Sequence, residues 1–125
     1  MNSKRRRDLR LRGGIYEDAV IEGLIQRGFK LITRNYYVHQ RGELDAVMER
    51  GQNIYIIEVK ARKIREDYPD PIESIGPLKI KRIKSCLPYL LSDYGLFGRN
   101  IHFLAGCVNL NDDGSIQNVQ IIPFE

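Results

Sequence analysis

Two stretches of alternating side chains, separated by a short turn, constrain the fold of this chain more than any other feature. In residues 44–49 and 54–61, apolar side chains recur at every second position, which is the period of a β-strand. Between them, Gly51-Gln52 can form a two-residue hairpin loop, in which glycine provides the positive φ that a type II′ turn requires. The sequence therefore predicts an antiparallel hairpin that pairs Arg50 with Asn53.

The turn also predicts which side chains face one another. Counting outward from the loop, Leu44 and Ala46 lie together on an apolar face of the hairpin. The charged residues then form two cross-strand pairs on the other face, Asp45 opposite Glu58 and Glu43 opposite Lys60. Directly opposed Cβ atoms are about 4.5–5.5 Å apart, so both carboxylates of the first pair can reach one cation. A register slip of one residue would place the two acids on opposite faces.

The opposed carboxylates indicate a metal site, because they repel each other unless a proton or a cation lies between them. Oxygen ligands favour Mg²⁺ or Mn²⁺ over zinc, which prefers histidine and cysteine. Lys60 would add a fixed positive charge beside Glu58. Such a set suits phosphodiester hydrolysis by water that the metal activates, with the lysine stabilising the transition state or orienting the water. The alternative is a salt-bridge ladder on a solvated face, although Val47, Ile54 and Ile56 make that face unusually apolar.

An acidic residue followed by Glu-x-Lys on the next strand resembles the PD-(D/E)XK nuclease core, the fold of restriction endonucleases and archaeal Holliday-junction resolvases. More closely, the chain is similar to the YraN-like family of small uncharacterised bacterial proteins, from about Gly14 to about Val108. The residues that carry the resemblance are Glu17 and Ala19, Arg34-Asn35, Gly42-Glu43-Leu44-Asp45, Glu58-Val59-Lys60, Arg62 and Lys79. Members usually carry Arg-Phe-Asp on a late strand, where this chain has His102-Phe103-Leu104.

The resemblance implies a single α/β domain, with a mixed central β-sheet flanked by helices, that hydrolyses phosphodiester bonds in DNA, including branched DNA. In that scheme Asp45 and Glu58 bind Mg²⁺ or Mn²⁺, and Lys60 is the catalytic lysine. Glu17 contributes a further acid to catalysis and metal binding, and Glu43 is another candidate ligand. The competing hypothesis is a nucleic-acid-binding or assembly module that keeps the fold without cutting. Junction-cutting enzymes of this fold act as symmetric pairs, so a homodimer is expected by analogy.

Basic residues gather in three places and predict contacts with a nucleic-acid backbone. Residues 1–12 carry a net charge of +5, while the whole chain carries +4, so we expect residues 1–13 to form a flexible basic tail ahead of a domain over 14–125. The second cluster follows the Glu58 strand, and the third lies at the start of the next helix. Together they supply the phosphate-binding candidates Arg62, Lys63, Lys79, Lys81 and Arg82. The alternative is that these are ordinary solvated charges.

The rest of the pattern predicts the order helix, three strands, helix, two strands. The expected bounds are 15–28 for the first helix, 29–38 for the first strand, and 100–110 and 115–124 for the last two strands around a turn at 111–114. Pro77 fits the first position of the second helix, and Pro88 should kink or split that helix.

Several functional classes are disfavoured by composition. The chain has 125 residues, enough for one core, and lacks the run of about eighteen apolar residues that a membrane-spanning helix needs. Cys86 and Cys107 have no metal-ligand spacing and are expected to be buried thiols of a cytoplasmic protein. His102 stands alone in an apolar strand, which favours a packing role at the core or its rim over a catalytic one.

Overall fold

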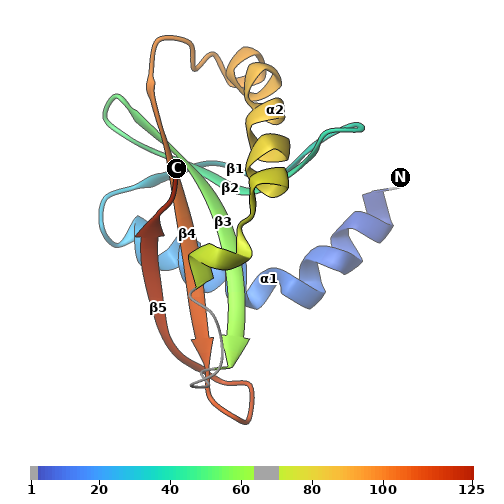
Figure 1. Ribbon diagram of the computed structural model, residues 1–125, viewed down its shortest axis with the longest axis vertical. Helices are drawn as coiled ribbons and strands as arrows, with labels where there is room; N and C mark the ends of the chain where they lie inside the picture. The colour runs from blue at the N-terminus through green and yellow to red at the C-terminus, as the bar shows by residue number, and fades with distance from the viewer. Residues whose placement is uncertain (1–2, 64–70) are drawn as a thin grey trace.

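The computed structural model describes residues 3–63 and 71–125, with side chains at 14–63 and 73–125. Its elements are α1 (Ser3–Ile25), β1 (Lys30–Val38), β2 (Gly42–Arg50), β3 (Asn53–Lys63), the 3₁₀ helix η1 (Pro71–Ser74), α2 (Pro77–Tyr94), β4 (Asn100–Leu110) and β5 (Ile116–Pro123). Figure 1 shows these elements along the chain. The predicted order of helices and strands is confirmed, and η1 is an addition to it.

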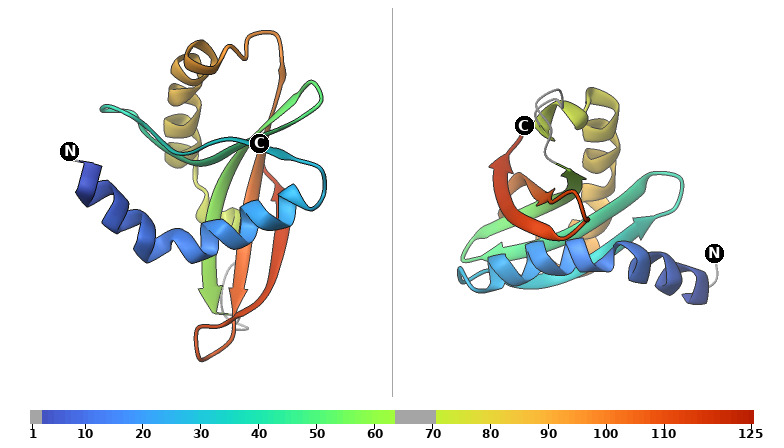
Figure 2. Two further views of the ribbon diagram at one scale, coloured as in Figure 1. Left: turned by 180° about the vertical axis from the view of Figure 1, so that it is seen from behind. Right: turned by 90° about the horizontal axis from the view of Figure 1, so that it is seen from below.

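The sheet is mixed and lies between the two long helices. Its strand order is β1-β2-β3-β4-β5, with β3 and β4 parallel and the other neighbours antiparallel. Figure 2 shows α1 on one face of the sheet and α2 on the other. This arrangement confirms the predicted single α/β domain with a restriction-endonuclease-like core. Two apolar clusters fill the layers, one between the sheet and α1 and one between the sheet and α2.

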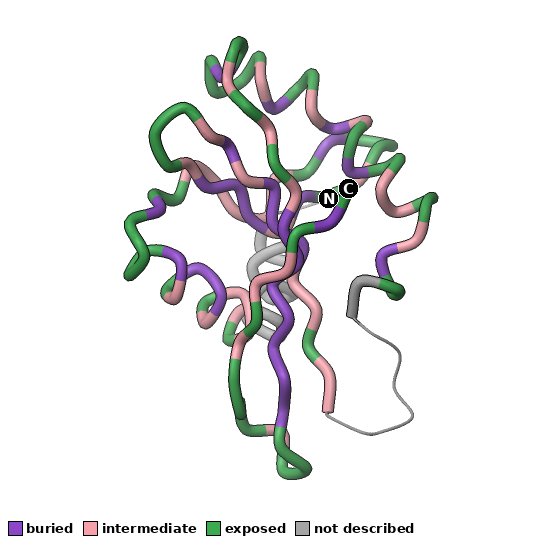
Figure 3. Tube along the Cα trace, turned by 60° about the vertical axis from the view of Figure 1, so that its left-hand side comes forward, coloured by how far each residue is buried: buried purple, intermediate pink, exposed green. Residues whose placement is uncertain are grey.

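Both faces of the central strands are buried, as expected for a parallel pair that is covered by helices. In β4 every residue from Leu104 to Leu110 is buried (Figure 3). Gly106 lies in this stretch, where a Cβ would come within 2.7 Å of Cγ1 of Val20. The absence of a side chain at Gly106 therefore lets α1 approach the sheet closely.

The predicted hairpin register is confirmed near the turn and fails farther out. Arg50 pairs with Asn53 and Ala46 pairs with Ile57, and Gly51 has the positive φ expected of it, 60°. The β2–β3 ladder ends at that second pair, so Asp45 is not directly opposite Glu58, nor Glu43 opposite Lys60. In Figure 1 the β1–β2 hairpin turns away while β3 continues alongside β4.

The prediction that Leu44 and Ala46 share a face is also wrong. Leu44 belongs to the α2-side cluster and Ala46 to the α1-side cluster. The strict alternation used for the prediction presumes a regular strand, but β2 changes face at Asp45. On the neighbouring strand the corresponding position is Asn35, whose φ is 51°, a left-handed conformation that asparagine tolerates better than most residues.

The helix ends differ from the predictions in two respects. α1 begins at Ser3, well before the expected start at 15. The lysine, arginine and leucine residues between these two positions are good helix formers. Whether the basic segment 1–13 is flexible or contacts nucleic acid stays a prediction. α2 begins at Pro77, as predicted, with Gly76 as its N-cap, but Pro88 does not split it. Pro88 is exposed, so water can satisfy the carbonyl group whose helical partner it removes.

No helix among the described residues is both long and apolar enough to cross a membrane. Cys86 and Cys107 are buried thiols outside any disulfide, as the sequence predicts. Burial raises the pKa of the Cys86 thiol, which keeps it protonated and unreactive.

Candidate functional site

The site begins where β2 and β3 separate. The backbone N–H of Val59 donates a hydrogen bond of 2.8 Å to Oδ2 of Asp45. In an antiparallel ladder every second opposed pair is hydrogen-bonded, starting with the pair that flanks a two-residue loop. Continued in this register, the ladder would instead have Val59 donate to the carbonyl of Leu44. The Asp45 side chain thus takes the place of a backbone acceptor and occupies the opening between the strands.

Glu58 lies beside this opening and is nearly inaccessible, with 4% of its surface exposed. Its Oε1 is 3.2 Å from Nζ of Lys79 at the start of α2 and 3.8 Å from Nζ of Lys60 on its own strand. A buried carboxylate is costly unless it is paired with positive charge. The two ammonium groups supply that charge in the metal-free protein.

The carboxylate of Asp45 is less well compensated by positive charge than that of Glu58. Burial, followed by repulsion from the carboxylate of Glu58, raises the pKa of Asp45 to about 7. Glu17 adds to this rise, while the Val59 N–H and Lys79 oppose it. Asp45 and Glu58 therefore interact electrostatically as predicted, although they are not ladder partners. A site in which one carboxylate resists ionisation near neutral pH is one that a cation would stabilise.

Glu17 reaches the same region from α1. Its carboxylate accepts hydrogen bonds from Nη2 of Arg34, at 3.1 Å, and from Nδ2 of Asn35, at 3.2 Å. Arg34 also bonds Asp18 at 2.6 Å. In the β1–β2 register Asn35 falls opposite Asp45, between two paired positions. No role for Arg34 and Asn35 was predicted, and the only signal for them in the sequence is the motif Arg34-Asn35 in the family pattern.

Glu43 is not paired with Lys60 in the way that the hairpin count implied. It pairs with Tyr37 across the β1–β2 ladder and is exposed. Among the described residues no three histidine, cysteine or acidic side chains are already arranged around one metal position. The donor chemistry nevertheless fits Mg²⁺ or Mn²⁺, because Asp45, Glu58 and Glu17 offer only carboxylate oxygens.

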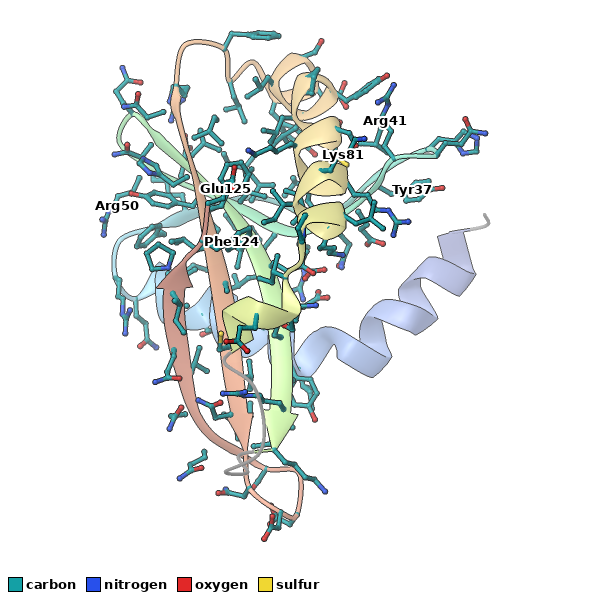
Figure 4. The ribbon with its side chains drawn as sticks, viewed as in Figure 1. Tyr37, Arg41, Arg50, Lys81, Phe124 and Glu125 are labelled. Atoms are coloured by element: carbon teal, nitrogen blue, oxygen red, sulfur yellow. The ribbon has the colours of Figure 1, made fainter. Side chains whose placement is uncertain are left out.

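The predicted phosphate-binding residues divide into two groups. Lys79 pairs directly with Glu58, which the sequence analysis did not foresee. Lys81 and Arg82 are exposed on the next residues of α2, and Arg62 and Lys63 are half-buried near the end of β3. Figure 4 labels Lys81 on α2 and Arg41 near the tip of the neighbouring hairpin. Arg41 lies 5.1 Å above the Tyr89 ring of α2, which brings another positive charge to this side of the molecule.

His102 has the structural role predicted for it. It is exposed at the rim of the sheet, stacks on Tyr55 at 5.0 Å between ring centroids, and its Nε2 lies 2.8 Å from Oδ1 of Asn53. Leu104, at the position where the family resemblance leads one to expect aspartate, is buried in the α1-side cluster. That position serves core packing in this chain.

The fold and the acidic opening between β2 and β3 define a restriction-endonuclease-like α/β protein. Within that class, the chain belongs to the uncharacterised protein family UPF0102, whose model matches residues 16–108. This confirms the predicted family, and the match contains Glu17, Asp45, Glu58, Lys60 and Lys79.

Individual relatives support the assignment over most of the chain. The UPF0102 protein of Dictyoglomus turgidum is 32% identical over 111 residues, which cover 89% of this chain and 92% of that protein. The Moorella thermoacetica protein is 33% identical over 113 residues, covering 90% and 92%. The Chlorobium limicola protein reaches 40% over 72 residues, covering 57% and 54%. Pyrococcus furiosus SfsA, solved in complex with Ca²⁺, aligns with 94% of this chain and 65% of its own at 17% identity and a TM-score of 0.38, too weak a likeness to carry an argument.

Proposed function

We propose that this protein is a metal-dependent nuclease that hydrolyses phosphodiester bonds in DNA, with branched or junction DNA as the favoured class of substrate. The observation that carries the proposal is the juxtaposition of the buried Glu58 carboxylate, the half-buried Asp45 carboxylate and two lysines at one strand opening. Burial, and after it repulsion from the carboxylate of Glu58, raises the pKa of Asp45 to about 7. Lys60 and Lys79 lie within 3.8 Å of Glu58.

Asp45 and Glu58 would hold Mg²⁺ or Mn²⁺, and Glu17 would add a ligand or orient one. Glu43 remains a candidate that would have to turn toward the opening. When bound, the ion would supply Lewis acidity at the scissile phosphate and help generate the nucleophile. Glu17 can exchange its hydrogen bonds with Arg34 and Asn35 for such an ion. Its carboxylate is close enough to Asp45 to raise the pKa of that residue.

The lysines have separate roles in the proposal. Lys60 lies on the same strand as Glu58 and half-exposed, so its ammonium can orient the attacking water or stabilise the negative charge that develops on the phosphate. Lys79 neutralises Glu58 until the ion arrives and is then free to contact phosphate. Lys81, Arg82, Arg62 and Lys63 would bind the DNA backbone without reading its sequence.

The first test is metal binding followed by cleavage. Mn²⁺ titrated into the metal-free protein should bind saturably, and Asp45→Ala and Glu58→Gln should each weaken binding by at least about tenfold. Asp112→Asn is the matched control, because Asp112 is exposed in the β4–β5 turn. Cleavage should then be measured on duplex, single-stranded and four-way-junction DNA. Lys60→Met should abolish cleavage while leaving Mn²⁺ bound. Metal binding that is insensitive to Asp45→Ala would rule out the proposed centre.

One observation favours a second candidate function, a nucleic-acid-binding or assembly module that does not cut. Glu58 is already neutralised by two lysines, and the described residues hold no preformed three-residue metal group. This candidate predicts DNA binding that is independent of Mg²⁺ and that Lys81→Glu weakens. It also predicts no product from any of the three substrates with Mg²⁺ or Mn²⁺ present. Cleavage by the native protein that is lost in Lys60→Met excludes the module.

A further inference from the structure

The turn of the β1–β2 hairpin contacts one side of α2. A Cβ at Gly42, which follows the turn, would lie 3.8 Å from Cβ of Arg82 and 3.8 Å from Sγ of Cys86. Farther along the helix, the guanidinium carbon of Arg41 lies 5.1 Å from the centroid of the Tyr89 ring. In Figures 1 and 2 the tip of the hairpin projects beyond α2. The hairpin and the helix therefore meet along a line that ends at a tyrosine and an arginine.

Tyr89 and Arg41 form a flat pair that is open to solvent. Tyr89 is 44% exposed, and Arg41 is exposed as well. Tyr36 is different, because its hydroxyl donates a hydrogen bond to Asp93 and its ring packs edge-on against Tyr94. Aromatic rings and guanidinium planes are the groups on which proteins stack unpaired nucleobases. The Tyr89–Arg41 pair thus has both the chemistry and the exposure that base stacking requires.

The same side of the molecule carries positive charge that the protein does not neutralise. α2 contains four basic residues, all in its first half, and one acidic residue near its end. Among the ion pairs of the described residues, none involves Arg41, Lys81 or Arg82. Figure 4 labels Arg41 and Lys81 on this side. A strand of nucleic acid fits both features, because it offers phosphates to the cations and flat bases to the Tyr89–Arg41 pair.

We propose that Tyr89 and Arg41 stack an unpaired base of a DNA strand whose backbone runs along α2 from the acidic site. Lys79 contacts Glu58 at the start of the helix, and Tyr89 follows ten residues later, about 15 Å along the helix axis. A strand of a few nucleotides spans that distance, with its phosphates beside Arg82. Bases inside a duplex are covered on both faces by their neighbours, so only an unpaired base can stack on the pair.

The inference rests on the proposed function, because it places the DNA of that proposal on the protein and narrows its class. The substrate would be DNA with unpaired nucleotides next to the phosphodiester bond that is cut. The two proposals can nevertheless fail separately. Stacking is measured without a metal ion, so stacking without cleavage contradicts the nuclease alone, and cleavage without a preference for unpaired bases contradicts the stacking alone.

The first experiment measures DNA binding by fluorescence anisotropy with a chelator present. The probes are a blunt duplex, the same duplex with a single-stranded overhang, and a single-stranded oligonucleotide. The native protein should bind the overhang probe about tenfold more tightly than the blunt duplex. Tyr89→Ala should weaken binding of both probes with unpaired bases by about tenfold, and binding of the blunt duplex by less than about twofold. Equal affinity of the native protein for the overhang and blunt probes overturns the proposal.

Two further variants separate stacking from a structural role of the ring. Tyr89→Phe keeps the aromatic face and should bind all three probes as the native protein does. Tyr37→Ala is the matched control, because Tyr37 is 42% exposed and lies between two residues that pack toward α2, so that its own side chain points to the other face of the hairpin. This variant should leave all three affinities unchanged. If Tyr89 only anchors the hairpin, Tyr89→Ala will weaken all three probes equally, and that result, or no weakening, contradicts stacking.

The second experiment detects the stacked base directly. The chain contains no tryptophan, so Tyr89→Trp introduces a single indole, whose fluorescence a stacked base should quench. A single-stranded oligonucleotide should quench this fluorescence, whereas an abasic oligonucleotide of the same length and charge should not. Tyr37→Trp is the control and should respond to neither. Equal quenching of Tyr89→Trp by the two oligonucleotides would mean that only the DNA backbone binds here, and no quenching by either would mean that no base reaches Tyr89; both results overturn the proposal.

Discussion

The carboxylate of Asp45 accepts a hydrogen bond from the backbone N–H of Val59 at 2.8 Å, at the point where β2 and β3 part. The Asp45 side chain thus ends the β2–β3 ladder and places a half-buried acid beside the buried Glu58. The same contact explains why the pair can exist in the fold, because the N–H stabilises the ionised form that burial and Glu58 disfavour. The geometry of the candidate metal site is therefore set by strand separation.

Asp45→Asn should flatten the pH dependence of stability in the metal-free protein. The pKa of Asp45 is about 7 in the folded state and near 3.8 in the unfolded chain, so the folded state binds more protons between these values. The free energy of unfolding therefore falls as pH rises through this window, by at most about 1.4 kcal/mol per pH unit. The asparagine keeps an acceptor for Val59 without the charge. Urea denaturation with a chelator present measures this, and parallel pH profiles for the two proteins would contradict it.

Mn²⁺ binding should release protons below pH 7. A metal ion binds the ionised carboxylate, so the ion displaces the proton that Asp45 retains in the metal-free protein. Calorimetry at pH 6 in buffers with different ionisation enthalpies should give about one proton released per ion, and the number should fall toward zero by pH 8. Asp112→Asn should behave as the native protein does. Binding without proton release at pH 6 would place the ion elsewhere.

Local pattern was enough to predict the element order, the turn at Gly51-Gln52 and the register from Arg50 to Ala46. It failed at Asp45, because a period-two reading presumes that a strand stays regular and paired. The left-handed backbone at Asn35 lies on a different strand, and no residue near Asp45 in the sequence indicates it. The pairing of Lys79 with Glu58 was out of reach for a related reason, since it depends on how α2 docks over the sheet.

Gly106→Ala should destabilise the fold. The new methyl group would lie 2.7 Å and 2.9 Å from the two Cγ atoms of Val20, which is fully buried and is a short, β-branched side chain. We expect a loss of about 1–3 kcal/mol in the free energy of unfolding. Gly23→Ala is the control, because the space around it is open and alanine favours a helix by up to about 1 kcal/mol. Val20→Ala should recover part of the loss in a double-mutant cycle; simple additivity would contradict the steric explanation.

Lys79→Met should tighten metal binding. The Lys79 ammonium lies 3.2 Å from the Glu58 carboxylate and competes with an incoming cation for the same oxygen. The lysine side chain is 40% exposed, so the ion pair is screened and worth at most about 1 kcal/mol, which corresponds to about fivefold in affinity. Lys81→Met is the matched control, because Lys81 is exposed on the same helix and should leave the affinity unchanged. Calorimetric titration with Mn²⁺ compares the two variants, and weaker binding by Lys79→Met would mean that this lysine supports the metal site instead of competing with the metal.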